Sequence, residues 1–164
     1  MPGRLSLLAY SLLVMSVTFP SPASAENPRP FKARVTAQWD NIFAALPPTL
    51  EGAGLANFLG TGQVTHLGKA GQAGSLTLEE PDDTGAFPGS GSVTMTAANG
   101  DTLTFDYVGY LNPATGEGIG TFKFTGGTGR FANASGCGTF DALIDVSQPV
   151  AQAMSVVLDG QISY

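Results

Sequence analysis

The chain has 164 residues, of which 43% are apolar and only 12% are charged. This apolar share excludes a solvated disordered polymer, because such chains bury too little surface to offset the entropy lost on ordering. The 22 glycines are well above the usual share, but they follow no Gly-X-Y period, so a collagen-like repeat is excluded as well. We expect a single domain, since domains usually contain roughly 100–200 residues.

Residues 1–25 have the pattern of a secretory signal peptide. Arg4 precedes an apolar run over residues 5–19, and Ala23-Ser24-Ala25 fits an A-x-A cleavage site. The alternative is an uncleaved membrane anchor, but the run is shorter than the roughly 20 residues that span a bilayer. We therefore expect cleavage after Ala25, which leaves one domain over residues 26–164 that is secreted or periplasmic and has no membrane span.

The remaining chain is acidic and contains a single thiol. Removal of Arg4 leaves six of the 7 Lys and Arg against 13 Asp and Glu, hence a net charge of −7. Such a chain neutralises phosphates poorly, so we expect neither nucleic acid nor an anionic membrane surface as a partner. Cys137 is the only cysteine, which excludes an internal disulfide. We expect it to be a small buried residue; the alternative is a reactive or intermolecular thiol.

Eight segments have the apolar–polar alternation or the composition of β-strands. In the first segment, Phe31, Val35 and Trp39 share one face and the polar residues between them face the other way. The eight segments are residues 31–39, 55–69, 75–79, 92–97, 102–110, 120–125, 138–146 and 154–164.

The connections between these segments contain residues that break strands. Residues 41–46 could form one helical turn that ends at Pro47-Pro48. Glycines within 55–69 favour bulges in that segment, and residues 79–91 form a polar loop. Asn99-Gly100 is a dipeptide that accepts positive φ in a type I′ hairpin turn.

Eight short strands with almost no helix predict an all-β sandwich or a closed antiparallel barrel. The final segment runs to Tyr164 without a charged tail that would protect a sheet edge. Pairing of this segment with the first would remove the edge. We therefore favour an eight-stranded antiparallel barrel over a sandwich.

The most distinctive segment is 120–136, with the sequence GTFKFTGGTGRFANASG. It resembles the hairpin of strand, GGTG, aromatic residue, A-x-G and strand found in the allene oxide cyclase and dirigent superfamily. Thr65-His66-Leu67-Gly68 is similar to a tetrapeptide of small exported bacterial proteins that share this barrel. The resemblance implies an eight-stranded, calycin-like barrel. It also implies that no cofactor is needed, since some members steer a cyclisation or a radical coupling inside the barrel without one.

The same segment favours a tight connection on its residues alone. Gly126, Gly127 and Gly129 permit positive φ. Residues 130–134 could form one helical turn, which would tuck Phe131 under the barrel end as a cap. The alternative for Arg130 is a role that faces a ligand.

Other constellations give weak signals for nucleotide, metal or nucleophilic sites. Residues 127–132 fit G-x-G-x-x-A, but a dinucleotide site needs a long helix inside a βαβ unit, for which there is no room. His66 is the only histidine, and we expect it to be structural and hydrogen-bonded rather than part of a catalytic triad, because no G-x-S-x-G elbow is present. The acidic run 79–83 could hold calcium but lacks the spaced ligand pattern, so we expect no metal. Asn133-Ala134-Ser135 is a glycosylation sequon, which would matter only in a eukaryotic secretory pathway.

The sequence leaves two main hypotheses for function. The first is an exported β-barrel that binds a small apolar molecule or a protein partner, itself included as a homo-oligomer. The alternative is a cofactor-free cyclase or isomerase that confines a hydrophobic substrate inside the barrel. Its candidate catalytic residues are polar residues on strands whose facing the sequence leaves open: Arg34, Asp106, Tyr107 and Tyr110. A surface or matrix component that self-associates is a third possibility.

Overall fold

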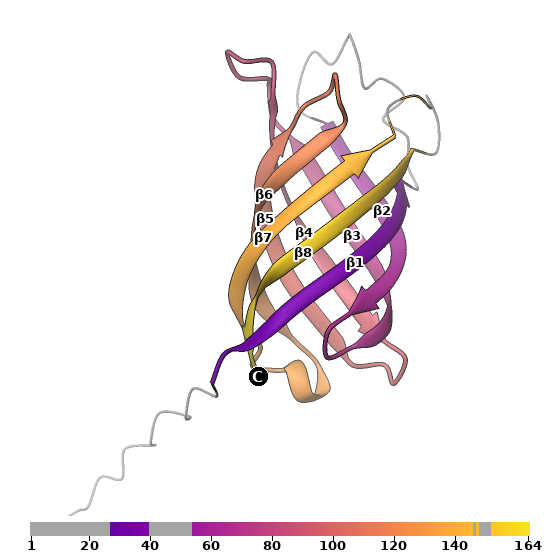
Figure 1. Cartoon of the computed structure of the whole chain (residues 1–164), viewed down its shortest axis with the longest axis vertical. Helices are drawn as coiled ribbons and strands as arrows, with labels where there is room; N and C mark the ends of the chain where they lie inside the picture. The colour runs from indigo at the N-terminus through magenta and orange to yellow at the C-terminus, as the bar shows by residue number, and fades with distance from the viewer. Residues whose placement is uncertain (1–26, 40–53, 146, 148–151) are drawn as a thin grey trace, which may run out of the picture.

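The computed structural model describes residues 27–39, 54–145, 147 and 152–164 (Figure 1). The predicted signal peptide and the predicted helical turn at 41–46 lie outside the described residues. Within the described part of the chain, no helix is long and apolar enough to cross a membrane.

Eight antiparallel strands form a closed barrel in which every strand pairs with its neighbours in the chain and the last pairs with the first (Figure 1). Val35 of the first strand lies opposite Val156 of the last, so the barrel has no open edge. This confirms the all-β, eight-stranded prediction. The strands are β1 (Arg29–Trp39), β2 (Gly54–Val64), β3 (Gly68–Leu78), β4 (Phe87–Ala97), β5 (Thr102–Leu111), β6 (Glu117–Gly127), β7 (Ser135–Ile144) and β8 (Ala153–Ser163).

The period-two alternation places one face of each strand inside the barrel. In β1, Phe31, Val35 and Trp39 are buried and the polar residues between them are exposed. The same rule puts Leu103 and Phe105 of β5 inside. The strands therefore build a single apolar core along the barrel axis.

Two turns differ from their predictions. Residues 55–69 are not one interrupted strand, because β2 ends at Val64 and β3 begins at Gly68. In the connection, His66 has a φ of 70°, and Gly68, where β3 begins, has a φ of 73°. At Asn99-Gly100 only Gly100 has positive φ, 88°, whereas a type I′ turn needs it at both central residues. The Ala97 N–H donates to Asp101 O (2.9 Å), which encloses three loop residues and fits a type I turn followed by a glycine bulge.

One end of the barrel is closed by aromatic side chains. We call it the η1 end, after the short helix η1 (Gly129–Phe131) in the β6–β7 connection. Phe131 is fully buried and packs on Tyr164 with ring centroids 4.8 Å apart, which confirms its predicted role as a cap. Inside this end, four phenylalanine rings lie in mutual contact with centroids 4.9 to 6.1 Å apart; they belong to Phe31, Phe105, Phe122 and Phe124.

Candidate functional site

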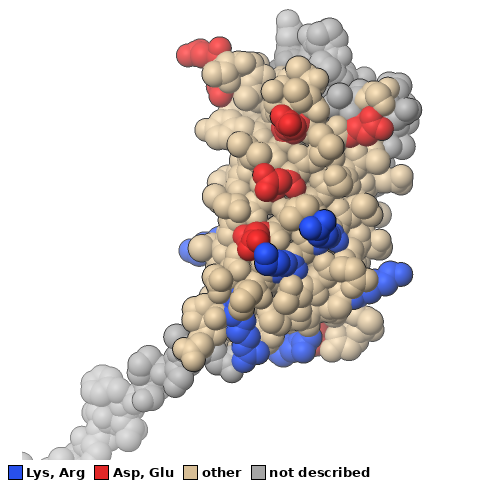
Figure 2. Space-filling model, viewed as in Figure 1, with Lys and Arg blue, Asp and Glu red and all other residues tan. Residues whose placement is uncertain are grey.

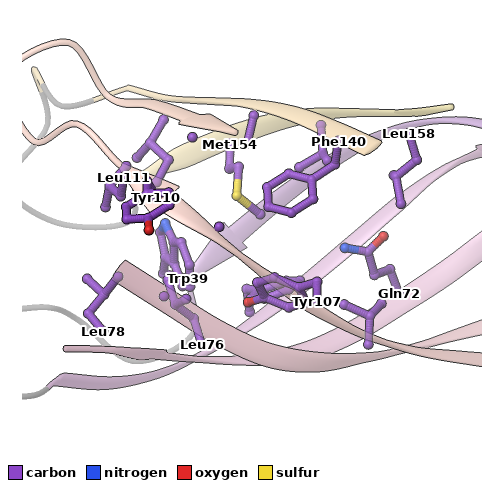
Figure 3. Close-up of a pocket in the computed structure, with 18 of the residues that line it drawn as sticks. Trp39, Gln72, Leu76, Leu78, Tyr107, Tyr110, Leu111, Phe140, Met154 and Leu158 are labelled. Carbon is purple, nitrogen blue, oxygen red and sulfur yellow. The ribbon is translucent and has the colours of Figure 1, made fainter. Parts of the chain in front are cut away.

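The half of the barrel away from the η1 end contains a cavity of about 80 Å³. Figure 3 shows Gln72 and Leu158 at its deep end and Leu78 and Leu111 at the other, near the ends of their strands. Tyr110 also borders the cavity, although it lies on the outward face of β5 and is 55% exposed. None of the described residues that line it is charged. They are Trp39, Phe58, Gln72, Leu76, Leu78, Gly89, Val93, Phe105, Tyr107, Gly109, Tyr110, Leu111, Gly118, Phe140, Ala142, Ile144, Met154, Val156 and Leu158.

Four small inward-facing residues leave room for the cavity in this half of the barrel. Gly89 of β4 lies opposite Gly109 of β5, and Gly118 of β6 lies opposite Ala142 of β7, and all four line the space. At the η1 end the corresponding inward positions carry the phenylalanine rings. The same strand pattern therefore fills one half of the barrel and leaves room in the other.

Tyr107 is an inward-facing polar residue of the cavity wall. Its hydroxyl donates to Ser75 O of β3 (2.8 Å), and its ring packs edge-on against Phe140 with centroids 5.6 Å apart. Burial raises the pKa of the Tyr107 phenol well above its ordinary value of 10.0. Tyr107 is therefore a neutral hydrogen-bonding group at neutral pH and is a poor proton acceptor.

Gln72 is a buried polar residue of the cavity wall that was not predicted from the sequence. It is only 7% exposed, and its Oε1 accepts no hydrogen bond from any described residue. A buried acceptor without a donor costs about 1–3 kcal/mol. The alternation of β3, counted back from Leu76 and Leu78, places Gln72 on the inner face, and that count could have found it.

The four candidate catalytic residues are divided between the two faces of the barrel. Arg34 is exposed on β1 and Asp106 is exposed on β5, so neither side chain faces the cavity. Tyr107 faces inward and lines the cavity, whereas Tyr110 lies on the outward face of β5 with Asp106 and only borders the cavity. The structure thus places Tyr107 alone among the four inside the barrel and leaves Arg34, Asp106 and Tyr110 on its outward face.

His66 and Arg130 belong to the η1 end. His66 Nε2 lies 3.0 Å from Pro30 O, which agrees with the predicted structural role. The Arg130 guanidinium donates to His66 O and stacks over the Phe131 ring at 4.8 Å. Arg130 therefore holds the closed end together from outside and does not reach the cavity.

Cys137 lies on the outer face of β7 and is exposed. The prediction that it is buried was wrong. Its neighbours Gly136 and Gly138 have no side chains, so no apolar–polar alternation beside Cys137 indicates whether it points inward or outward.

Charged residues are sorted along the barrel. In the view of Figure 2, basic side chains gather toward the η1 end and acidic ones toward the opposite end. The β3–β4 connection carries Asp82, whose carboxylate accepts from the Thr84 hydroxyl (2.6 Å) and the Thr84 N–H (2.8 Å). These bonds from Thr84 lower the pKa of Asp82, and equivalent bonds from Ser147 lower that of Asp145 in the β7–β8 connection. Both carboxylates therefore stay charged at neutral pH near the end where the cavity opens.

Comparisons with known proteins add little to this description. No protein-family model matches the sequence, and no curated protein is significantly similar to it. Among solved structures, the chain is similar to the pterocarpan synthase dirigent protein GePTS1, with 13% sequence identity and a TM-score of 0.47 over 93% of this chain and 99% of that one. A similarity this low gives no information about activity, and the barrel fold described above is established by the pairing of this chain's own strands.

Proposed function

We propose that this protein is an exported β-barrel that binds a small apolar molecule in the half of the barrel away from the η1 end. The observation that carries the proposal is the cavity itself, whose described lining is uncharged and almost entirely apolar. Export is supported by the signal-peptide pattern of residues 1–25, and the compartment would be extracellular or periplasmic.

The size and chemistry of the cavity favour a compact apolar ligand over water. A water molecule needs only about 10–15 Å³ of such space, but it also needs two to four polar partners, and apolar cavities stay dry and accept apolar molecules instead. The volume of about 80 Å³ is small compared with the roughly 300–1,000 Å³ of pockets for drug-sized ligands. A molecule with about one ring is therefore the expected size.

The alternative of a cofactor-free cyclase or isomerase would use the same cavity. Confinement of a flexible substrate would lower the entropy cost of reaction, and Tyr107 and Gln72 would supply its hydrogen bonds. The outward positions of Arg34 and Asp106 favour binding without chemistry. Recovery of a bound ligand in unchanged form supports the binding role, whereas a rearranged product supports the enzyme.

Self-association is favoured by a separate observation on the outer surface. Tyr110 and Ile119 lie opposite each other on β5 and β6, and they are 55% and 59% exposed. Val157 on β8 is exposed as well. A second copy of the chain could cover these side chains, and sedimentation at increasing protein concentration distinguishes a monomer from a homo-oligomer.

The binding proposal is tested by filling the cavity with a larger side chain. Val156 of β8 lines the cavity, and the next residue, Val157, points outward and is 42% exposed. Val156→Phe places a ring inside, and Val157→Phe adds the same atoms outside as a matched control. Trp39, the only tryptophan of the chain, lines the cavity, so its fluorescence reports occupancy directly.

Cyclohexylmethanol, a non-fluorescent compound with one ring, is a suitable probe. We expect saturable binding to the wild-type protein and to Val157→Phe. In Val156→Phe the affinity should fall by about tenfold or more, which corresponds to a loss of about 1.4 kcal/mol. Absence of saturable binding to the wild type, or equal binding to both variants, contradicts the proposal.

A further inference from the structure

We propose that Gln72 selects, among small apolar molecules, those that carry a hydroxyl or N–H donor at the end that enters the cavity first. This inference rests on the proposed function, because it names the chemical class of the ligand that the cavity takes. The ligand would carry its hydrogen-bond donor at one end. That end would lie deep in the barrel, and the apolar body would lie toward the surface.

Gln72 is positioned at the inner end of the cavity (Figure 3). It lies on the inner face of β3, between Gly60 of β2 and Met95 of β4 in the strand register. Its side chain is 93% buried, since only 7% of it is exposed, and it lines the deep end of the cavity (Figure 3). A long polar side chain at this position is placed where the leading end of a ligand would stop.

The side-chain oxygen of Gln72 lacks a hydrogen-bond donor among the described residues. Gln72 Oε1 is buried and receives no hydrogen bond from the described residues. More than about 90% of buried polar groups in native proteins have a partner, so an acceptor without one indicates a donor that comes from elsewhere. A ligand hydroxyl or N–H supplies that donor.

Neighbouring polar groups do not fill this role. The Tyr107 hydroxyl donates its proton to Ser75 O at 2.8 Å, which leaves it only acceptor capacity toward the cavity. A lone water could donate to Gln72 Oε1, but a buried water needs two to four polar partners. The cavity lining is instead mostly apolar, with side chains such as Leu76, Val93 and Leu158. A ligand that brings its own apolar body fits these surroundings better than water.

Two isomers of the same size show whether the hydrogen-bond donor of the ligand, and not only its apolar body, contributes to binding. Cyclohexylmethanol carries a hydroxyl, and methoxycyclohexane has the same atoms but no donor. We expect the wild-type protein to bind the alcohol about tenfold more tightly than the ether, by Trp39 fluorescence and by calorimetry. The alcohol loses more hydrogen bonds with water on entry, so a preference for it requires a specific acceptor inside.

Gln72→Met removes the acceptor and keeps the volume nearly unchanged. We expect this variant to bind the ether as the wild type does, and to lose or reverse the preference for the alcohol. It should also be at least as stable as the wild type without ligand, because no buried acceptor is left without a donor. Gln63→Met, an exposed glutamine on the neighbouring strand β2, is the matched control and should keep the preference.

The outcomes separate the two proposals. If neither isomer binds the wild type, the proposed function fails. If both isomers bind the wild type equally, the cavity takes apolar ligands but the role of Gln72 is overturned, and this result needs no variant. A preference for the alcohol that persists in Gln72→Met, or in Gln72→Leu should the first variant not fold, also overturns the role of Gln72.

Discussion

Tyr107 reaches from β5 to the backbone of β3 across the whole width of β4. The residue of β4 that lies opposite it is Gly91, and a Cβ there would lie 2.7 Å from the Tyr107 hydroxyl oxygen. The absence of a side chain at Gly91 therefore makes the hydrogen bond to Ser75 O possible. This bond fixes the phenol against the cavity wall, where burial raises its pKa.

Replacement of Tyr107 tests this arrangement through its pH dependence. At neutral pH, Tyr107→Phe should lower the free energy of unfolding by about 1–2 kcal/mol, because the hydrogen bond is lost. The pKa of the phenol is raised in the folded state above the unfolded value of 10.0. Its contribution is therefore complete below that pH, and it is lost as the pH rises, because the unfolded chain then releases a proton that the folded chain keeps.

Urea denaturation between pH 8 and pH 11 measures this difference. The wild type should lose stability above about pH 10 more steeply than Tyr107→Phe, so the two curves converge. Parallel curves over this range would show that the phenol is not shielded from solvent.

Whether a side chain points into or out of the barrel could be predicted from the sequence only where the apolar–polar alternation is uninterrupted. Phe31, Val35 and Trp39 were predicted to share a face, and all three are buried. Gln72 was missed because it lies between the predicted segments 55–69 and 75–79, and Cys137 was misplaced because glycines flank it. Which polar residue meets the cavity depends on contacts between strands that are distant in the sequence.

At the scale of the strands, glycine has two distinct uses. Gly91 faces inward, and a Cβ there would collide with Ser75 O of the adjacent strand. Gly71 of β3 faces outward, and nothing lies within 4 Å of the position of its Cβ. The inward glycine allows two strands and a tyrosine to approach closely, whereas the outward one has no such constraint.

This contrast predicts opposite effects for the same substitution. Gly91→Ala should lower the free energy of unfolding by about 1–3 kcal/mol, because neighbouring strands must shift. Gly71→Ala should be neutral or raise it by up to about 1 kcal/mol, because alanine reduces the freedom of the unfolded chain. Chemical denaturation of both variants provides the measurement. Equal effects would mean that strand glycines contribute only through backbone entropy.

The strands themselves were largely predictable, whereas some turns were not. Apolar alternation and the need to pair the last strand with the first indicated a closed barrel of eight strands. The β2–β3 turn was missed because it depends on a positive φ at His66, and residues other than glycine adopt positive φ only uncommonly. Short turns are determined by single backbone angles, which residue types indicate only weakly.

At the scale of the whole molecule, the barrel has two unlike halves. The η1 end is filled by the phenylalanine cluster and capped by Phe131, and the other half holds the cavity beneath connections that carry Asp82 and Asp145. Among the described residues, the connections at the cavity end therefore bring negative charge from Asp82 and Asp145. This arrangement fits neutral apolar molecules better than carboxylates.

The size of the cavity could not be predicted from the sequence, since it depends on how eight strands curve around one another. The account rests on the claim that this half of the barrel holds an apolar ligand. A crystal structure of the protein soaked with cyclohexylmethanol tests it most directly. We predict density for the ring between Trp39 and Phe140, with its hydroxyl within hydrogen-bond distance of Gln72 Oε1. A space filled by protein side chains, or one that contains only ordered water, would contradict the account.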